Sequence, residues 1–276
     1  MKKTKGKYLA VSRRFFFLFL LLLPFTSTSN EPPVFDFVSE IHANTNLFKI
    51  DNLSNLYWIE DGGLVKYTQD TGKRIQYSDK SFGSITAVDV ADPLNIIVLF
   101  SEFNKIVFLD KNLAPRKVQK EDSFIENLMP SLVCSSRQNG FWLYSPVSYK
   151  LYKFSDNFEM ETESRALNHQ FPGFLQPFHM LEHNNQLFIS DPSSGIWVFD
   201  QFASFLFIIP VSNVTFFQVR DNDILYFYED QMGIYSIEEQ VEEVFLLPEE
   251  NVVQGYLHEL SLYLLVDGSI KHYKVK

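Results

Sequence analysis

Residues 55–74 read NLYWIEDGGLVKYTQDTGKR, and this stretch decides the fold. Two short apolar runs, around Tyr57 and around Val65, are rich in the aromatic and β-branched side chains that favour strands. Asp61-Gly62-Gly63 between them is typical of a tight hairpin turn, because aspartate and glycine tolerate a left-handed backbone. Thr71-Gly72 marks a second turn. The stretch therefore predicts a strand, a hairpin turn, a second strand and a further turn.

The same hairpin recurs five more times along the chain. Its first strand is echoed by NIIVLF from Asn95, FWLY from Phe141, LFIS from Leu187, LYFY from Leu225 and LYLL from Leu262. Each second strand carries two apolar residues three positions apart: Leu64 with Tyr67, Ile106 with Leu109, Leu151 with Phe154, Ile196 with Phe199, Ile234 with Ile237, and Ile270 with Tyr273. A spacing of about forty residues accommodates four short strands and their turns, which is the period of a propeller blade.

Two further strands are expected to flank each hairpin. Inner strands precede it, as in SITAVDV from Ser84 and SLVCSS from Ser131, and outer strands follow it, as in RIQYSD from Arg74. The last repeat stops after its third strand, whereas VFDFVSE from Val34 is a spare strand that can complete it and leave no free sheet edge. We therefore predict an all-β fold, in which residues 30–276 form a single six-bladed β-propeller of four-stranded blades, closed by an N-terminal strand that completes the last blade.

The repeats resemble those of six-bladed propellers with NHL-like or YVTN-like repeats from the bacterial cell envelope, over nearly all of residues 30–276. This resemblance implies the architecture and a protein that offers rigid binding faces. A second resemblance is local, because YTQDTGKRIQY from Tyr67 is similar to a quinoprotein-type propeller repeat. Such repeats also occur in non-enzymatic envelope scaffolds of the outer-membrane assembly machinery, so the match does not imply a quinone, and no cofactor is expected.

Residues 1–29 have the features of a signal peptide. Six basic residues come first, and the nine apolar residues Phe15–Leu23 follow them, ahead of Pro24 and several small polar residues. A membrane span needs about twenty apolar residues, so this run is too short to be one, and no transmembrane segment is expected after cleavage. SRRFFF from Ser12 leaves open a twin-arginine export route. We expect an exported protein, with the periplasm as its first expected location and secretion as the alternative.

Charge and cysteine content exclude several classes of function. Without residues 1–29 the chain has 18 basic and 34 acidic residues, a formal charge of −16. This balance argues against nucleic acid as a partner, since such binding depends on Lys and Arg contacts to phosphates. Cys134 is the only cysteine, so no intrachain disulfide can form. A protein or another envelope component is the expected partner, and the sequence predicts no oligomeric state.

The strongest catalytic motif is HMLEH at 179–183, which matches the H-x-x-E-H pattern of zinc peptidases. That chemistry requires both imidazoles on one helical face. Here the segment is expected to be an inner strand, on which residues four apart stand about 13 Å from each other, too far to share one zinc ion. We therefore predict no catalytic residues and no metal site. A lactonase-like hydrolase with a metal in the central channel stays as an alternative, although its opening Glu-Gly-Pro signature is absent from the sequence.

The first candidate binding site combines acidic turns with an apolar loop. The turns between second and third strands contain Asp61, Glu102, Asp191, Asp230 and Asp267. The loop HQFPGFLQPFH at 169–179 contributes Phe171, Phe174 and Phe178. These rings are either an exposed recognition surface for a protein or glycan, or are buried over the propeller face.

The second candidate site is a ring of polar residues on the loops that join first and second strands. Its members are Asn52, Asp92, Arg137, His183, Asp221 and His258. These residues are either ordinary solvated turns or a binding ring at the mouth of the channel. Because no catalytic set converges, we favour a non-enzymatic protein-interaction scaffold of the cell envelope, with a small-molecule or glycan binder as the other alternative.

Overall fold

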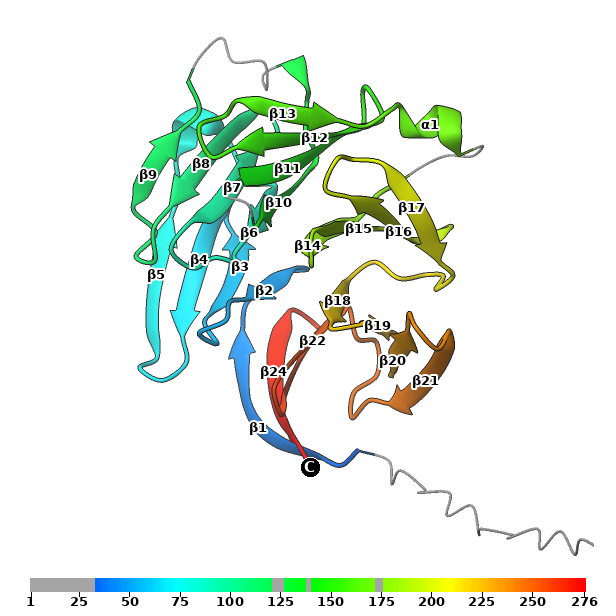
Figure 1. Cartoon of the computed structure of the whole chain (residues 1–276). Helices are drawn as coiled ribbons and strands as arrows, with labels where there is room; N and C mark the ends of the chain where they lie inside the picture. Colours follow the sequence, from blue (N-terminus) through cyan, green and yellow to red (C-terminus); the bar gives the residue numbers. More distant parts are fainter. Residues whose placement is uncertain (1–32, 121–126, 138–139, 172–175) are drawn as a thin grey trace, which may run out of the picture. The chain divides into compact units, whose positions relative to one another are not determined.

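The computed structural model describes residues 33–120, 127–137, 140–171 and 176–276 (Figure 1). This part of the chain forms six four-stranded antiparallel sheets arranged as a β-propeller. The helical elements in it are a 3-10 turn at Lys80–Phe82 and the four-residue helix α1 (Leu167–Gln170). The predicted all-β, six-bladed fold is therefore confirmed, whereas the predicted signal peptide at 1–29 lies outside the described residues.

In the first five blades the strands follow one another from the channel outward. Blade 1 contains β2 (Phe48–Ile50), β3 (Leu56–Glu60), β4 (Gly63–Thr68) and β5 (Lys73–Tyr77). Blade 2 contains β6 (Ala87–Asp89), β7 (Ile96–Phe100), β8 (Lys105–Leu109) and β9 (Pro115–Val118). Blade 3 contains β10 (Leu132–Ser136), β11 (Gly140–Ser145), β12 (Lys150–Ser155) and β13 (Met160–Glu163). Blade 4 contains β14 (His179–His183), β15 (Gln186–Asp191), β16 (Gly195–Asp200) and β17 (Phe205–Ile209). Blade 5 contains β18 (Phe217–Arg220), β19 (Asp223–Tyr228), β20 (Gln231–Ser236) and β21 (Val241–Leu246).

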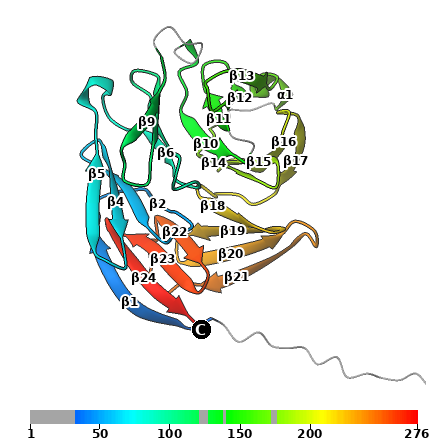
Figure 2. The ribbon, with the colours of Figure 1, turned by 60° about the vertical axis from the view of Figure 1, so that its left-hand side comes forward.

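Blade 6 is built from both ends of the described chain. Its strands are β22 (Gln254–His258), β23 (Ser261–Val266), β24 (Ser269–Val275) and β1 (Phe35–His42). The strand β1 pairs antiparallel with β24, from Phe35 opposite Val275 to His42 opposite Ser269. Figures 1 and 2 show this blue strand running alongside the red one. The N-terminal strand thus occupies the fourth position of the last blade, the place that the sequence predicts for it.

The hairpin turns have the backbone that their residues favour. In the β3–β4 turn, Asp61 and Gly62 have φ values of 51° and 73°, and in the β23–β24 turn Asp267 and Gly268 have 50° and 74°. Two consecutive residues with positive φ are the mark of a type I′ turn, whose twist matches that of the strands. The Asp-Gly pairs therefore fix the two hairpins locally.

The core lies between neighbouring blades and is rich in aromatic rings. All five residues of β7 are buried, as are four of the five in β8. Between blades 2 and 3, Phe141 lies edge-on to Phe108 at 5.6 Å between ring centroids and stacks on Phe154 at 5.4 Å. Cys134 is buried in the next contact, between blades 3 and 4, as a free thiol. Aromatic and aliphatic burial thus holds the blades together.

Blades 6 and 1 meet through polar contacts as well as packing. The side chain of Gln254 accepts a hydrogen bond from the Phe48 backbone N–H (3.0 Å) and donates one to the Phe48 carbonyl (2.8 Å). Gln69 donates from Nε2 to the Tyr263 hydroxyl at 2.9 Å. The side-chain amide of Gln254 thus forms the pair of hydrogen bonds that a neighbouring strand would form. It satisfies backbone groups of the short strand β2 that would otherwise be unpaired.

Candidate functional site

The central channel opens on two faces of the propeller. We call the face on which the inner strands begin the start face, and the face on which they end the end face. In an antiparallel blade the turns between second and third strands also lie on the start face, whereas the turns between first and second strands lie on the end face. The two candidate sites from the sequence therefore belong to opposite faces.

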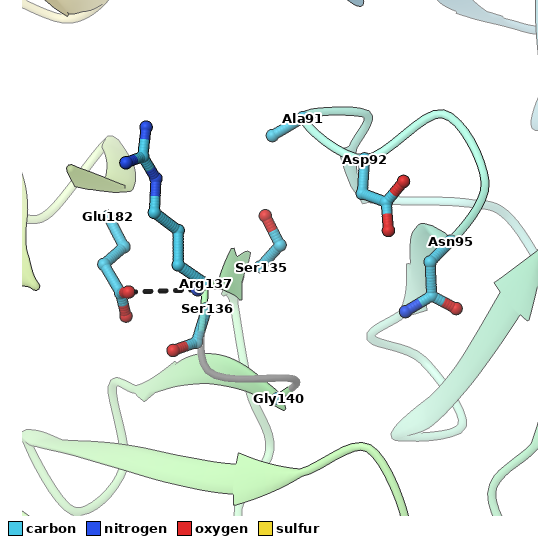
Figure 3. Close-up of a pocket in the computed structure, with 8 residues that line it drawn as sticks. All are labelled: Ala91, Asp92, Asn95, Ser135, Ser136, Arg137, Gly140 and Glu182. Carbon is cyan, nitrogen blue, oxygen red and sulfur yellow. Dashed lines mark hydrogen bonds between the residues drawn. The ribbon is translucent and has the colours of Figure 1, made fainter. Parts of the chain in front are cut away.

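A polar pocket of about 280 Å³ opens on the end face (Figure 3). It lies at the ends of the inner strands of blades 2, 3 and 4. Its lining residues are Ala91, Asp92, Asn95, Ser135, Ser136, Arg137, Gly140 and Glu182. The inner strands of three consecutive blades end side by side here, so short polar residues that are far apart in the sequence share one space.

Glu182, near the end of β14, anchors one wall of this end-face pocket. Its Oε2 accepts a hydrogen bond from Trp142 Nε1 at 2.6 Å, and its Oε1 accepts one from the Arg137 backbone N–H at 3.0 Å. Hydrogen bonds to a carboxylate are stronger than those between neutral groups. Glu182 therefore joins blade 4 to blade 3 and holds the backbone of Arg137 in place.

Arg137 is the cation that lines this pocket. Its guanidinium points away from the carboxylate of Glu182 (Figure 3), and no hydrogen bond or ion pair joins it to another residue within the described ranges. Nearby, Ser136 Oγ is buried and has no hydrogen-bond partner in that part of the chain. The pocket thus holds donors that a ligand could satisfy.

Arg137 also affects the protonation of His183, at the end of the next inner strand. The pKa of His183 lies below its usual value, first because the ring is desolvated and second because Arg137 is close, whereas Asp221 opposes the shift. His183 Nε2 is buried without a hydrogen-bond partner among the described residues. A neutral imidazole is therefore favoured beside the guanidinium.

The structure gathers part of the predicted polar ring. All six members lie where inner strands end. Asp92 and Arg137 line the same pocket, and Arg137 and Asp221 both act electrostatically on His183. Asn52 and His258 do not line the pocket. Sequence reasoning missed Glu182, although it lies inside the HMLEH motif, because its partners Arg137 and Trp142 come from another blade about forty residues away.

The acidic turns of the start face behave differently from one another. Asp61, Glu102 and Asp267 are exposed in the β3–β4, β7–β8 and β23–β24 turns, and Asp230 is half-buried between β19 and β20. Asp191 is only 2% exposed and accepts hydrogen bonds from Ser193 N (2.9 Å) and Ser193 Oγ (2.6 Å). The expectation that Asp191 faces a partner is therefore corrected: its carboxylate stabilises its own turn.

The phenylalanines of the 169–179 loop also differ in burial. The ring of Phe171 packs against Trp197 at 4.5 Å and against Phe205 at 4.8 Å between centroids, so it is partly buried against the core between blades 3 and 4. Phe178 is 48% exposed and rests edge-on against Phe216. Phe174 lies outside the described residues. Of the two readings of this loop, burial holds for Phe171 and exposure for Phe178.

The HMLEH segment is strand β14, as predicted. Its first histidine, His179, contacts Lys49 Nζ through Nδ1 at 3.2 Å, on the start-face side of the channel. Its last, His183, lies near Arg137 on the end-face side. Within the described part of the chain, no group of three or more His, Cys, Asp or Glu side chains could hold a metal ion.

Comparison with known proteins identifies the fold and no family. No protein-family model matches the sequence, and no curated protein matches it. Virginiamycin B lyase from Staphylococcus aureus matches in structure with a TM-score of 0.59 and 12% identity, over 82% of this chain and 79% of that chain. BamB from Moraxella catarrhalis matches with a TM-score of 0.54 and 11% identity, over 87% of this chain and 100% of that chain.

A chain of the mitotic checkpoint complex matches with a TM-score of 0.63 and 8% identity, over 87% of this chain and 94% of that chain. At such low identities the likeness establishes the propeller fold alone. Among the described residues, no helix is both long and apolar enough to cross a membrane.

Proposed function

We propose that this chain is an exported, non-enzymatic scaffold of the cell envelope whose end-face pocket binds a carboxylate of a protein partner. Three observations support the proposal. Residues 1–29 have the features of an export signal. The hairpin repeats resemble those of envelope propellers. The structural neighbours include BamB and a component of the mitotic checkpoint complex, which is by its name a multiprotein assembly.

We place the binding site on the end face because the guanidinium of Arg137 has no partner among the described residues. Its backbone is fixed by Glu182, whereas no acceptor within the described ranges occupies its side chain. A guanidinium fits a carboxylate through two parallel hydrogen bonds, which gives both strength and orientation. Ser136 Oγ is buried in the same pocket and has no hydrogen-bond partner among the described residues, so it offers a further donor or acceptor.

The acidic groups around Arg137 limit the kind of partner that the pocket can bind. Asp92 and Glu182 line the same pocket, and the chain without residues 1–29 has a formal charge of −16. A run of acidic residues would be repelled by this field. The lining fits a single carboxylate, which can be an isolated Asp or Glu side chain or a chain terminus. Amide or hydroxyl groups beside that carboxylate would contact Asp92 and Asn95.

The test compares three forms of the full chain with a C-terminal affinity tag, expressed in the native host and purified from the envelope fraction. The parent, Arg137→Lys and Arg137→Gln are compared for the amount of each partner captured. We expect Arg137→Gln to retain less than a tenth of the parent's capture, and Arg137→Lys to fall between, because lysine keeps the charge and loses the bidentate geometry.

Arg165→Gln is the matched control, since Arg165 is exposed near α1 and does not line the pocket. It should capture the same partners as the parent, and all variants should melt at the same temperature. Full capture by Arg137→Gln would overturn the assignment of the pocket. An N-terminus that still includes residues 1–29 in the envelope-purified protein would overturn export with cleavage.

A further inference from the structure

A second pocket, of about 270 Å³, opens at the opposite mouth of the channel. It lies on the start face, where β2, β6, β10 and β14 begin. Most of its lining is apolar and comes from Leu47, Val88, Leu132, Phe178, Met180 and Phe216. Lys49 and His179 provide its basic groups. This start-face pocket shares no residue with the end-face pocket, so its occupant is a separate question.

The amine of Lys49 is held in this pocket without a counterion. Its Nζ contacts His179 Nδ1 at 3.2 Å, and no carboxylate oxygen lies within 4.0 Å of it in the described part of the chain. Asp89 acts on it from the neighbouring inner strand, and burial outweighs that carboxylate, so the pKa of Lys49 is lowered. The Cys134 thiol also faces it, but burial raises the pKa of Cys134 well above its usual value, which leaves the thiol neutral.

His179 cannot supply the missing negative charge. Burial and the nearby Lys49 hold the pKa of His179 well below its usual value, so its ring is neutral and accepts a hydrogen bond from the ammonium. A partly buried ammonium beside one neutral acceptor, with no carboxylate of the described chain in contact, is less stable than an ammonium in water. The arrangement becomes favourable when an anion binds.

We propose that the start-face pocket binds a small amphipathic carboxylate, with its apolar or aromatic body among Leu47, Phe178 and Phe216 and its carboxylate on Lys49. This inference does not depend on the proposed scaffold function. An apolar protein cavity of about 150 Å³ holds a benzene molecule. A cavity of about 270 Å³ therefore suits a phenyl ring that carries a short acid chain.

The lining also favours a monocarboxylate over other anions. Phosphate and sulfate esters are recognised by several donors or cations together, whereas Lys49 is the only Lys or Arg among the described residues that line this pocket. The exposed Phe178, resting on Phe216 at 5.1 Å between ring centroids, offers a ring face or edge to an aromatic body. A cationic ligand would place its charge against Lys49 and is disfavoured.

The test uses three probes that share one body and differ in the head group: 3-phenylpropionate, 3-phenylpropan-1-ol and 3-phenylpropylamine. Binding to the full chain is measured by titration calorimetry at neutral pH. We expect the acid to bind at least tenfold more tightly than the alcohol, and the amine to bind more weakly than the alcohol. Equal affinities for acid and alcohol would overturn the proposal.

Lys49→Met tests the residue itself. The variant should lose at least tenfold in affinity for the acid and change by less than twofold for the alcohol, because only the charge pair is removed. Its melting temperature should equal or exceed that of the parent, since a desolvated ammonium is replaced by an apolar chain of similar length. Lys73→Met, an exposed residue on β5, is the matched control and should bind both probes as the parent does.

A measurement on the unaltered protein keeps the proposal falsifiable if Lys49→Met fails to fold. Reductive methylation of lysines, followed by peptide mass spectrometry, reports the accessibility of each amine. Saturating 3-phenylpropionate should slow modification of Lys49 at least fivefold and leave Lys73 unaffected. Modification of Lys49 at the same rate with and without the acid would contradict the proposed contact.

Discussion

At the scale of single residues, Asp51 shows how one buried carboxylate fixes a whole turn. It is 1% exposed and lies between β2 and β3. Its Oδ1 accepts hydrogen bonds from the Leu53 and Asn55 backbone N–H groups at 2.9 and 2.8 Å, and its Oδ2 accepts one from the Tyr57 hydroxyl at 2.8 Å. Burial of the Tyr57 ring, and then the hydrogen bond that its hydroxyl donates to Asp51, raise the pKa of that hydroxyl. The adjacent Asn52, a member of the predicted polar ring, is exposed.

Replacing Asp51 by alanine should leave several buried donors without acceptors. Each unsatisfied buried group costs about 1–3 kcal/mol, so we expect the free energy of unfolding to fall by roughly 3 kcal/mol. Urea denaturation measures the change. Asn52→Ala is the neighbouring control and should stay within about 0.5 kcal/mol of the parent, as exposed substitutions do. If both variants were equally stable, Asp51 would not be the residue that holds the turn.

At the scale of elements, β1 stabilises the last blade mainly through its backbone. Most of its side chains are exposed. Phe35 and Ile41 pack against the core, and the exposed ring of Phe37 lies edge-on to the buried ring of Tyr273. The ladder with β24 nonetheless extends over nearly the whole strand, with one irregularity between Phe37 and Ser39. Without β1, the backbone N–H and C=O groups along one side of β24 would face solvent as a free sheet edge.

Deletion of residues 34–40 should therefore destabilise the propeller more than any exposed substitution in the strand. The lost ladder hydrogen bonds and the packing of Phe35 contribute about 1 kcal/mol each, so we expect roughly 4 kcal/mol in total, or about 10 °C in Tm. Calorimetry of the deletion is compared with Val38→Ser, which alters an exposed side chain and keeps the backbone. A deletion variant that melts with the parent would show that β1 does not stabilise the ring.

At the scale of the whole molecule, three histidines make stability depend on pH. Burial is the first cause that lowers the pKa of His179, of His183 and of His272. Nearby Lys49, Arg137 and Lys274 lower the same three values further. Above the usual histidine pKa of about 6.5 these rings are neutral in both states and contribute no pH dependence. Below it, the unfolded chain binds protons that the folded chain does not.

The folded state should therefore lose stability as the pH falls from about 6.5, by up to about 1.4 kcal/mol per pH unit for each histidine. Urea midpoints at pH 7.5, 6.5 and 5.5 measure this slope, in a range above the ordinary pKa of carboxylates. His272→Gln should reduce the slope, because it removes one of the three groups. A midpoint that is constant from pH 7.5 to 5.5 would contradict the assignment of the three partly buried, neutral rings.

The sequence by itself determined the hairpins, their period, the number of blades and the spare strand that belongs to the last blade. It could do so because these features are local: Asp61-Gly62 adopts its turn from its own backbone preferences, and runs such as Ile96–Phe100 are apolar enough to be buried strands. The same reasoning placed HMLEH on a strand, and β14 confirms it.

Only the tertiary structure decided which side chains meet. Glu182 joins Arg137 and Trp142 from another blade, Asp191 turns inward to stabilise its own loop, and Phe171 packs against the core whereas Phe178 stays exposed. The direction of a side chain at a strand end depends on the twist of its sheet and on the blade packed against it. Those are contacts between residues tens of positions apart, and no local pattern of polar and apolar residues specifies them.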